Sequence, residues 1–368
     1  MALKMGIVGL PNVGKSTLFN AITNLQVKVA NYPFATINPN IGTVEVPDER
    51  MDTLITLCEP HKANHSTFEF YDIAGLIAGA SKGDGLGNVF LQNIREADAI
   101  CMVIRCFDNK DITHVEGTID PIRDIEIINL ELIISDQEQI KKRIDNVVKK
   151  AQSFKQKEGV FEYELLIRLA ATLAENKLLK DITLSDDELK VVNNFNLLTI
   201  KPFIYVANVD EADLNQIDNL YVKTVKEYAS QQQIEVVVIC AKIEEELSAL
   251  EEESVDRELL MADYGIKEAG LSQLIKKSYA LLGLQTFFTA GKQEVRAWTF
   301  KKGATAPMCA GIIHSDFEQG FIRAEVYSYA DLVKYGSEKV VKENGRLRSE
   351  GKTYVMQDGD VCFFKFNV

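Results

Sequence analysis

The sequence predicts an α/β protein with a doubly wound, mostly parallel sheet, an inserted α-helical arm and a small C-terminal β-rich domain. The 368 residues are too many for one ordinary domain. Short apolar runs alternate with helical patterns, which is typical of a parallel sheet covered by helices. Two stretches, about 125–200 and after 284, break this alternation. The expected sheet strands lie near 3–8, 67–73, 99–106, 202–207 and 234–240.

Composition and charge narrow the classes of protein to consider. Apolar residues make up 46% and charged residues 26%, which is ordinary for a globular chain with a sizeable core. No apolar run approaches the roughly 20 residues that span a bilayer, and the N-terminal MALKMGIVGL lacks the layout of a signal peptide. We therefore expect a cytoplasmic protein that does not enter membranes. The net charge of −13 argues against indiscriminate polyanion binding.

The stretch from about 125 to 200 contains two long helical patterns. Leu130, Ile133, Ile140, Ile144, Val147, Ala151 and Phe154 fall at the a and d positions of one heptad frame. A second apolar helix follows Gly159. Two such helices around one turn predict an antiparallel coiled-coil arm, and the alternative is a helical subdomain packed on the body. We expect the arm at 129–199, inserted into a nucleotide-binding domain formed by 1–128 and 200–283.

Residues 284–368 have a different texture. Short alternating segments, EVRAWTF, FIRAEVYSY, KTYVMQ and DVCFFKF, are separated by turns that contain Gly. This pattern predicts a small β-rich domain of β-grasp size. The segment carries 12 Lys and Arg residues against 10 Asp and Glu, so the acidic excess lies elsewhere in the chain.

Residues 9–16, GLPNVGKS, form the motif that carries the most chemistry. GxxxxGKS between a strand and a helix is the P-loop, whose backbone N–H groups wrap around phosphates. Lys15 is expected to reach the β- and γ-phosphates, and Ser16 to offer its hydroxyl to Mg²⁺. Asn12 either helps to bind a monovalent cation such as K⁺ or caps the loop. The predicted nucleotide ligands here are Asn12, Val13, Gly14, Lys15, Ser16 and Thr17.

The tetrapeptide DIAG at 72–75 follows the expected strand TFEFY. In P-loop enzymes a strand-end Asp holds Mg²⁺ and a glycine N–H senses the γ-phosphate, so Asp72 and Gly75 are assigned these roles. Thr36 offers a second hydroxyl ligand for Mg²⁺. Leu76 stands where related enzymes place a water-orienting Gln, and leucine has no hydrogen-bonding group. His114, just past a strand end, is a candidate catalytic replacement, and the alternative is a structural loop histidine.

Several motifs together resemble one family. GLPNVGKST, NYPFATINPN, DIAGLIAGASKGDGLGN, HVEG, NVDE and CAKIE match, in this order, the Obg-like ATPase (YchF) subfamily of translation-factor-related P-loop GTPases. The resemblance covers essentially the whole chain and implies a coiled-coil arm and a C-terminal TGS domain. It also implies ATP hydrolysis in preference to GTP, Mg²⁺ ligation by Ser16 and Thr36, and association with the ribosome. Cys240, Ala241 and Lys242 occupy the place of a Ser-Ala-Lys loop near the base, where backbone contact is expected.

The stretch YVANVDEAD at 205–213 lies where GTPases carry Asn-Lys-x-Asp. Guanine offers two donors to that Asp, whereas adenine offers an acceptor and a donor on its N7/N6 edge. Val209 and Glu211 replace the Lys and the Asp, which weakens guanine selection, while Asn208 is still able to pair with adenine. The alternatives are a site that accepts either purine and a shifted loop in which Asp210 approaches the base.

Three functions therefore compete. The leading one is a Mg²⁺-dependent ATPase that acts as a slow switch on the ribosome and modulates translation or a stress response. The others are a GTPase with a degenerate motif, and an RNA- or ribosome-binding module whose nucleotide sets conformation. Residues 138–158 hold 7 basic and 3 acidic side chains, which favours contact with rRNA, although such runs are often solvated helix faces. Because the heptads can be satisfied within one chain, a monomer is expected.

Overall fold

The structure is a computed structural model that describes residues 3–29, 40–72, 86–109, 112, 117–151, 157–214, 219–252 and 254–367. The chain divides into two compact units. The first contains Leu3–Thr43 and Glu69–Leu274, and the second contains Val44–Phe68 and Ile275–Val368. None of the helices in these described ranges is long and apolar enough to cross a membrane.

The first unit is built on a parallel sheet with strand order β2-β4-β1-β5-β6-β7. Strand β1 pairs in parallel with β4 and β5, and β6 pairs in parallel with β5 and β7, which confirms the predicted doubly wound sheet. Every residue of β5 and β6 is buried, as expected for central strands covered on both faces. The strands are β1 (Lys4–Val8), β2 (Ile41–Glu45), β4 (Thr67–Asp72), β5 (Ala99–Arg105), β6 (Phe203–Asn208) and β7 (Glu235–Ile239).

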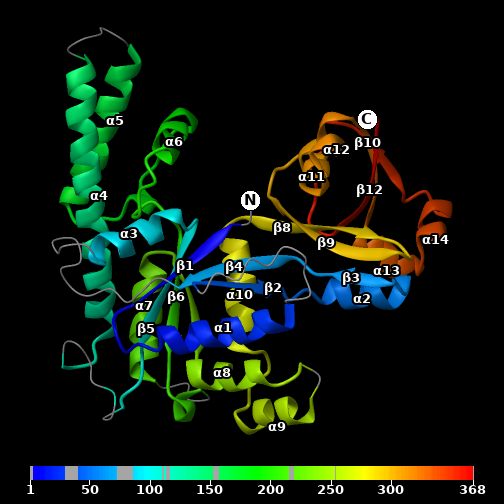
Figure 1. The fold of residues 1–368 in the computed structure, drawn as a ribbon, viewed down its shortest axis with the longest axis horizontal. Coiled ribbons are helices and arrows are strands. Elements are labelled where there is room, and N and C mark those ends of the chain that lie inside the picture. Colours follow the sequence, from blue (N-terminus) through cyan, green and yellow to red (C-terminus); the bar gives the residue numbers. More distant parts are fainter. Residues whose placement is uncertain are drawn as a thin grey trace. The chain divides into compact units, whose positions relative to one another are not determined.

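Helices surround this sheet (Figure 1). The helix after the P-loop, α1, packs on α8, while α7 packs on β6 and β7. These helices and their neighbours are α1 (Lys15–Val29), α3 (Leu86–Glu96), α6 (Asp186–Asn193), α7 (Leu220–Gln231), α8 (Ala241–Ala249) and α9 (Val255–Asp263). Helix α10 (Gly270–Leu281) begins in the first unit and ends in the second. Two short 3₁₀ turns, η1 (Leu179–Asp181) and η2 (Glu211–Asp213), complete the unit.

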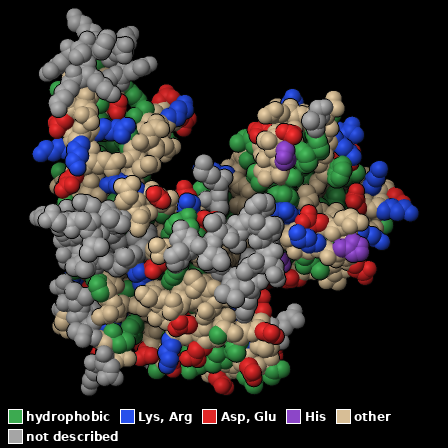
Figure 2. Space-filling view, in the orientation of Figure 1, with side chains coloured by type: hydrophobic (Ala, Val, Ile, Leu, Met, Phe, Trp, Pro, Cys, Tyr) green, Lys and Arg blue, Asp and Glu red, His purple; other side chains and the backbone are tan. Residues whose placement is uncertain are grey.

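The inserted arm consists of α4 (Pro121–Ala151) and α5 (Lys157–Ala174), which run side by side as a hairpin (Figure 1). Its seam buries Ile140 and Val147 of α4 against apolar residues of α5 such as Leu169. Leu130, which the heptad frame places in the seam, is instead 46% exposed. The reason is that the first half of α4 packs on β5 and α7 and buries another face, including Ile125 and Leu132. Figure 2 shows Lys and Arg side chains on the surface of the arm.

A buried carboxylate fixes α4 to the rest of the first unit. Asp136 is fully buried and accepts hydrogen bonds from the backbone N–H groups of Leu198 (3.0 Å) and Thr199 (2.8 Å). The Thr199 hydroxyl donates to it at 2.8 Å, and Arg95 at the end of α3 donates to it at 3.1 Å. Four donors compensate the burial of this charge, which would otherwise cost several kcal/mol.

The second unit has a mixed sheet with strand order β11-β10-β12-β8-β9-β3. The pairs β8–β9 and β10–β12 are antiparallel, whereas β12–β8 and β3–β9 are parallel. The alternating segment KTYVMQ does not form a strand. Within it Val355 makes an isolated bridge to Thr305. The strands are β3 (Lys62–Asn64), β8 (Leu284–Ala290), β9 (Glu294–Lys301), β10 (Phe321–Ser328), β11 (Arg348–Glu350) and β12 (Asp360–Phe366).

Helices cover both faces of this second sheet. On one face Cys309 and Ala310 of α11 pack with Phe287 and Phe364, and on the other Met51 of α2 packs with neighbours such as Phe288. The segment 44–68, which the sequence analysis assigned to the nucleotide domain, thus contributes α2 and β3 to the second unit. The helices are α2 (Glu49–Cys58), α11 (Ala306–Ile313), α12 (Ser315–Gln319), α13 (Tyr329–Tyr335) and α14 (Glu338–Glu343).

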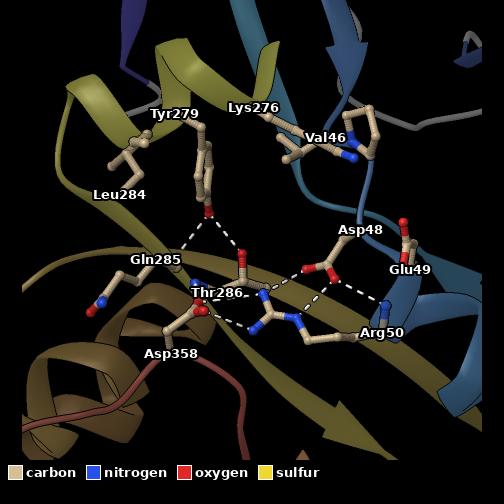
Figure 3. Close-up of a pocket in the computed structure, with 12 residues that line it drawn as sticks. Val46, Asp48, Glu49, Arg50, Lys276, Tyr279, Leu284, Gln285, Thr286 and Asp358 are labelled. Carbon is tan, nitrogen blue, oxygen red and sulfur yellow. Dashed lines mark hydrogen bonds and ion pairs between the residues drawn. The ribbon is translucent and has the colours of Figure 1, made fainter. Parts of the chain in front are cut away.

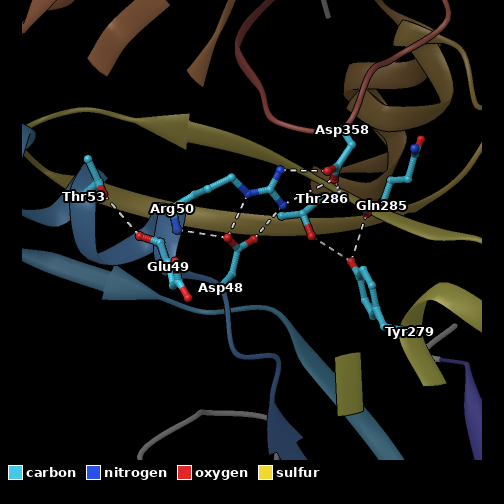
Figure 4. Close-up of polar contacts among 8 residues, drawn as sticks. All are labelled: Asp48, Glu49, Arg50, Thr53, Tyr279, Gln285, Thr286 and Asp358. Carbon is cyan, nitrogen blue, oxygen red and sulfur yellow. Dashed lines mark hydrogen bonds and ion pairs between the residues drawn. The ribbon is translucent and has the colours of Figure 1, made fainter. Parts of the chain in front are cut away.

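The second unit also contains a pocket of about 450 Å³ (Figure 3). Arg50 crosses its wall and joins two carboxylates, donating to both oxygens of Asp48 (2.8 and 2.7 Å) and to Asp358 (2.8 Å) (Figure 4). Asp358 also accepts from the Thr286 N–H at 2.8 Å, and the Tyr279 hydroxyl donates to the Gln285 carbonyl at 2.9 Å. These polar groups of the wall are paired with one another. We therefore interpret the pocket as a place where separate segments of the second unit are held together.

Candidate functional site

The P-loop leaves the carboxyl end of β1, with β4 and β5 on either side, which is the point where the strand order reverses. Two of its residues have a left-handed backbone, Asn12 with φ 63° and Gly14 with φ 93°. A Cβ at Gly9 would lie 2.9 Å from the Val13 side chain and 3.0 Å from the Val103 carbonyl. A Cβ at Gly14 would overlap the amide of Asn208. Both glycines of the motif are therefore required by close packing.

The predicted phosphate and metal ligands meet at this edge of the sheet. Lys15 begins α1, is 7% exposed, and forms an ion pair with Asp72, the last residue of β4. The two residues are brought together because β1 and β4 pair in parallel. Ser16 is exposed in the first turn of α1, next to Lys15. Thr36, Gly75, Leu76 and His114 lie outside the described residues, as does the Gly-rich segment up to residue 85.

Asn208, at the carboxyl end of β6, joins the P-loop to the loop that begins α8. Its side chain is buried, with the residue 4% exposed. The amide Nδ2 donates to the Val13 carbonyl at 2.8 Å, and Oδ1 accepts from the Ala241 N–H at 2.9 Å. The sequence predicts that this amide contacts the base, and the structure shows that it also bridges two backbone groups. One N–H and one lone pair remain for a base.

The residues after Asn208 are held by their own loop. Val209 is 2% exposed and its N–H donates to the Ile239 carbonyl at 2.9 Å, so its side chain belongs to the core. The Asp210 carboxylate accepts from the Glu211 N–H at 2.8 Å and caps η2. In this arrangement the Asp210 carboxylate is turned toward the local backbone.

Glu211 occupies the fourth position of the Asn-Lys-x-Asp-like stretch and is bound on both carboxylate oxygens. Lys242 donates to Oε1, and the Tyr264 hydroxyl donates to Oε2 at 3.3 Å. The hydrogen bond from Lys242 lowers the pKa of Glu211. Glu211 is therefore an ionised carboxylate with two donors from within the chain.

Cys240 and Ala241 contribute backbone to the site. Cys240 is 3% exposed, and burial raises the pKa of its thiol. Its carbonyl accepts from the Glu244 N–H at 3.0 Å, while its side chain makes no capping hydrogen bond at the start of α8. The N–H of Ala241 is the group that reaches Asn208. The expected backbone contact of this loop with a base stays a prediction.

Two buried charged residues near the site were missed by the sequence analysis. Glu244 is 4% exposed and accepts from the N–H groups of Gly270 (2.7 Å) and Leu271 (3.1 Å) at the start of α10; burial raises its pKa. Its position beside Ile243 and Leu247 on one helical face was the available signal in the sequence.

The second missed residue is Arg105, at the carboxyl end of β5. It is 1% exposed and donates to the carbonyls of Phe107 (3.2 Å), Asn109 (3.2 Å) and Ile112 (3.0 Å). Its guanidinium also lies 4.6 Å from the centre of the Phe107 ring. Arg105 thus shapes the first part of the loop that continues to the candidate His114, and no local pattern in the sequence marks it for that role.

Comparison with known proteins reveals relatives that match the chain from end to end. A family model described as "50S ribosome-binding GTPase" matches residues 4–152, and the model YchF-GTPase_C, described as "Protein of unknown function (DUF933)", matches residues 284–367. The chain is 55% identical over 369 residues to "Ribosome-binding ATPase YchF" of Bacillus subtilis (strain 168), covering 100% of each. It is 47% identical over 368 residues to the protein of the same name in Escherichia coli O157:H7, again covering 100% of each.

A solved structure agrees with these sequence relatives. The Schizosaccharomyces pombe YchF GTPase superposes with a TM-score of 0.89 at 38% sequence identity, covering 99% of this chain and 97% of that chain. These matches confirm the predicted fold class, a P-loop domain with a helical insertion and a TGS-like C-terminal domain.

Proposed function

The chain belongs to the YchF family, and on that premise we propose that it hydrolyses ATP at the P-loop site and binds the ribosome. The observation that carries this proposal is the meeting of the P-loop, Asp72 and Asn208 at the carboxyl ends of β1, β4 and β6 in one parallel sheet. Ligands for phosphate, for a metal and for a base come together there, as hydrolysis of a nucleoside triphosphate requires.

Mg²⁺ would be held by Asp72 and Ser16, with Thr36 as a further ligand. The Asp72 carboxylate and the Ser16 hydroxyl are the hard oxygen ligands that Mg²⁺ prefers, and both stand beside the predicted phosphate site. When bound, the ion neutralises charge on the β- and γ-phosphates. Lys15 then exchanges its ion pair with Asp72 for the phosphates, which leaves the carboxylate free to face the metal. Asn12 is the proposed neighbour of a bound K⁺.

Hydrolysis by this chain needs a group that orients the attacking water. Leu76 has no hydrogen-bonding atoms in its side chain, so we assign this role to His114 and the γ-phosphate sensor to Gly75. Arg105 donates hydrogen bonds to three backbone carbonyls and thereby fixes the start of the loop that leads to His114. A His114→Ala variant with unchanged turnover would remove the histidine from this role.

A preference for ATP over GTP follows from the contacts of Glu211 and Asn208. Guanine selection needs a carboxylate with both oxygens directed at the base, and the Glu211 oxygens are bound by Lys242 and Tyr264. Asn208 keeps one donor and one acceptor site for adenine N7 and N6. Use of GTP is the competing hypothesis, favoured by the word GTPase in the name of the Schizosaccharomyces pombe structure.

Contact with the ribosome is assigned to the arm and the C-terminal unit. Lys141 and Lys142 are exposed on α4, as rRNA contact requires. Arg143 is instead engaged within the chain, because it donates to Glu162 at 3.2 Å and lies 4.0 Å from the centre of the Phe195 ring. We propose a cytoplasmic monomer that modulates translation or a stress response through this contact.

Two measurements test the proposal. Nucleotide titration should give tighter binding of ATP than of GTP, and tighter GTP binding would refute the ATPase assignment. Cosedimentation with ribosomes at moderate salt should be retained in Lys15→Ala while turnover is lost, because binding and hydrolysis use different surfaces. If the wild-type chain never sediments with ribosomes, the partner proposal fails.

A further inference from the structure

We propose that Lys242 and Tyr264 are specificity-determining residues, which keep the site selective for adenine by holding the carboxylate of Glu211. This inference rests on the proposed function and deepens it, since it names the residues that reject guanine at the same site. The three side chains come from three elements: Glu211 begins η2, Lys242 lies in the first turn of α8, and Tyr264 caps the end of α9.

The geometry uses both oxygens of the carboxylate. Lys242 donates to Oε1 of Glu211, and the Tyr264 hydroxyl donates to Oε2 at 3.3 Å. The backbone of Glu211 is fixed as well, because its N–H donates to the Asp210 carboxylate at 2.8 Å. The Glu211 side chain is 29% exposed and that of Lys242 is 66% exposed. Lys242 and Tyr264, which together form a clamp on the Glu211 carboxylate, therefore lie at the rim of the site. There they can be substituted without exposing the core.

The hydrogen-bonding groups of the two purines explain why the clamp disfavours guanine and leaves adenine binding unchanged. Guanine presents N1–H and N2–H₂ to this position, and both must be accepted by one carboxylate lying in the plane of the base. To do so, Glu211 would have to leave an ammonium and a phenol for two neutral donors. Adenine has an acceptor at N1 and no amine at C2, so it needs nothing from Glu211. The clamp costs ATP no contact, whereas GTP meets a carboxylate already bound on both oxygens.

Removing the clamp should therefore raise the affinity for guanine nucleotides. We compare Lys242→Met, Tyr264→Phe and the double variant by competition titration of ATP, GTP, ADP and GDP on the full chain. The ratio of GTP to ATP dissociation constants should fall about threefold to tenfold in the double variant, the range expected for releasing one charged hydrogen-bonding group. The change should come from tighter GTP binding, with ATP affinity nearly constant.

Two control variants separate the clamp from general effects. Glu246→Gln removes a charge that acts electrostatically on Lys242 and Tyr264 and keeps the carboxylate of Glu211 in place, and it should leave the ratio unchanged. In a Glu211→Gln background the double variant should no longer change the ratio, because the carboxylate to be released is absent. Thermal unfolding of each variant confirms that it is folded.

The outcomes distinguish this inference from the proposed function. A wild-type chain that prefers GTP refutes both. A wild-type preference for ATP, with a ratio in the double variant that stays within twofold of wild type, refutes the clamp alone. An equal change of the ratio in the Glu211→Gln background also refutes it, since the effect would then not pass through the carboxylate.

Discussion

Replacing Asn208 by alanine removes the side chain that joins the P-loop to the start of α8. The Val13 carbonyl would lose its donor at 2.8 Å and the Ala241 N–H its acceptor at 2.9 Å, both in a buried place. Each buried group left unpaired costs about 1–3 kcal/mol, so for the two groups we expect a loss of about 2–6 kcal/mol in the free energy of unfolding. For a unit of this size the loss corresponds to a fall of about 4–24 °C in Tm.

The assay is thermal unfolding of the full chain, with nucleotide affinity measured in parallel. Asn20→Ala is a control for loss of an amide, because Asn20 of α1 donates an exposed hydrogen bond to Glu245 of α8 at 3.0 Å. We expect the control to change the free energy of unfolding by less than about 0.5 kcal/mol. Asn208→Asp should destabilise at least as much as Asn208→Ala, since a carboxylate oxygen would face the Val13 carbonyl and the buried charge would keep only the Ala241 N–H as a donor. Equal Tm values for Asn208→Ala and the control would refute the bridging role.

Three further substitutions test the buried charges. Asp136→Ala should lower the free energy of unfolding by about 3–5 kcal/mol, because it leaves Arg95 and two N–H groups without their acceptor; urea unfolding measures this. Glu244→Gln should lower the free energy of unfolding less than Glu244→Ala does. Burial raises the pKa of Glu244 in the folded state, so wild type should lose stability relative to Glu244→Gln as pH rises above about 4.5. Tm measured over a series of pH values checks this. Arg50→Ala should destabilise more than Asp358→Ala, because it takes the guanidinium away from two carboxylates, whereas in Asp358→Ala the guanidinium keeps its bonds to Asp48. Parallel Tm measurements decide, and the reverse order would contradict this.

Local patterns in the sequence predicted where several residues of the candidate nucleotide site lie in the fold. The P-loop is recognisable because its glycines and lysine follow a strand at fixed spacing, and parallel pairing brings Asp72 to Lys15. Strand and helix periods predicted the sheet and the inserted arm. The position of Asn208 at a strand end was also predictable, although its bridge between two backbone groups was not, since both partners lie far away in sequence.

Contacts between distant segments account for what the sequence did not predict. Nothing in residues 44–68 signals that β3 joins the sheet of the second unit and that α2 packs on it, because the strand that both contact, β9, lies more than 200 residues away. Leu130 fits a heptad but is exposed, because α4 packs on two different neighbours along its length. Arg105 looked like any charged residue at a strand end. The three-domain division at 128, 199 and 283 remains a prediction.

The most direct test of the central claim is the turnover of ATP and GTP by the full chain with Mg²⁺, at matched concentrations. We predict that ATP is hydrolysed with the higher kcat/KM and that Lys15→Ala abolishes this turnover. A higher kcat/KM for GTP, or ATP turnover that persists in Lys15→Ala, would contradict the account.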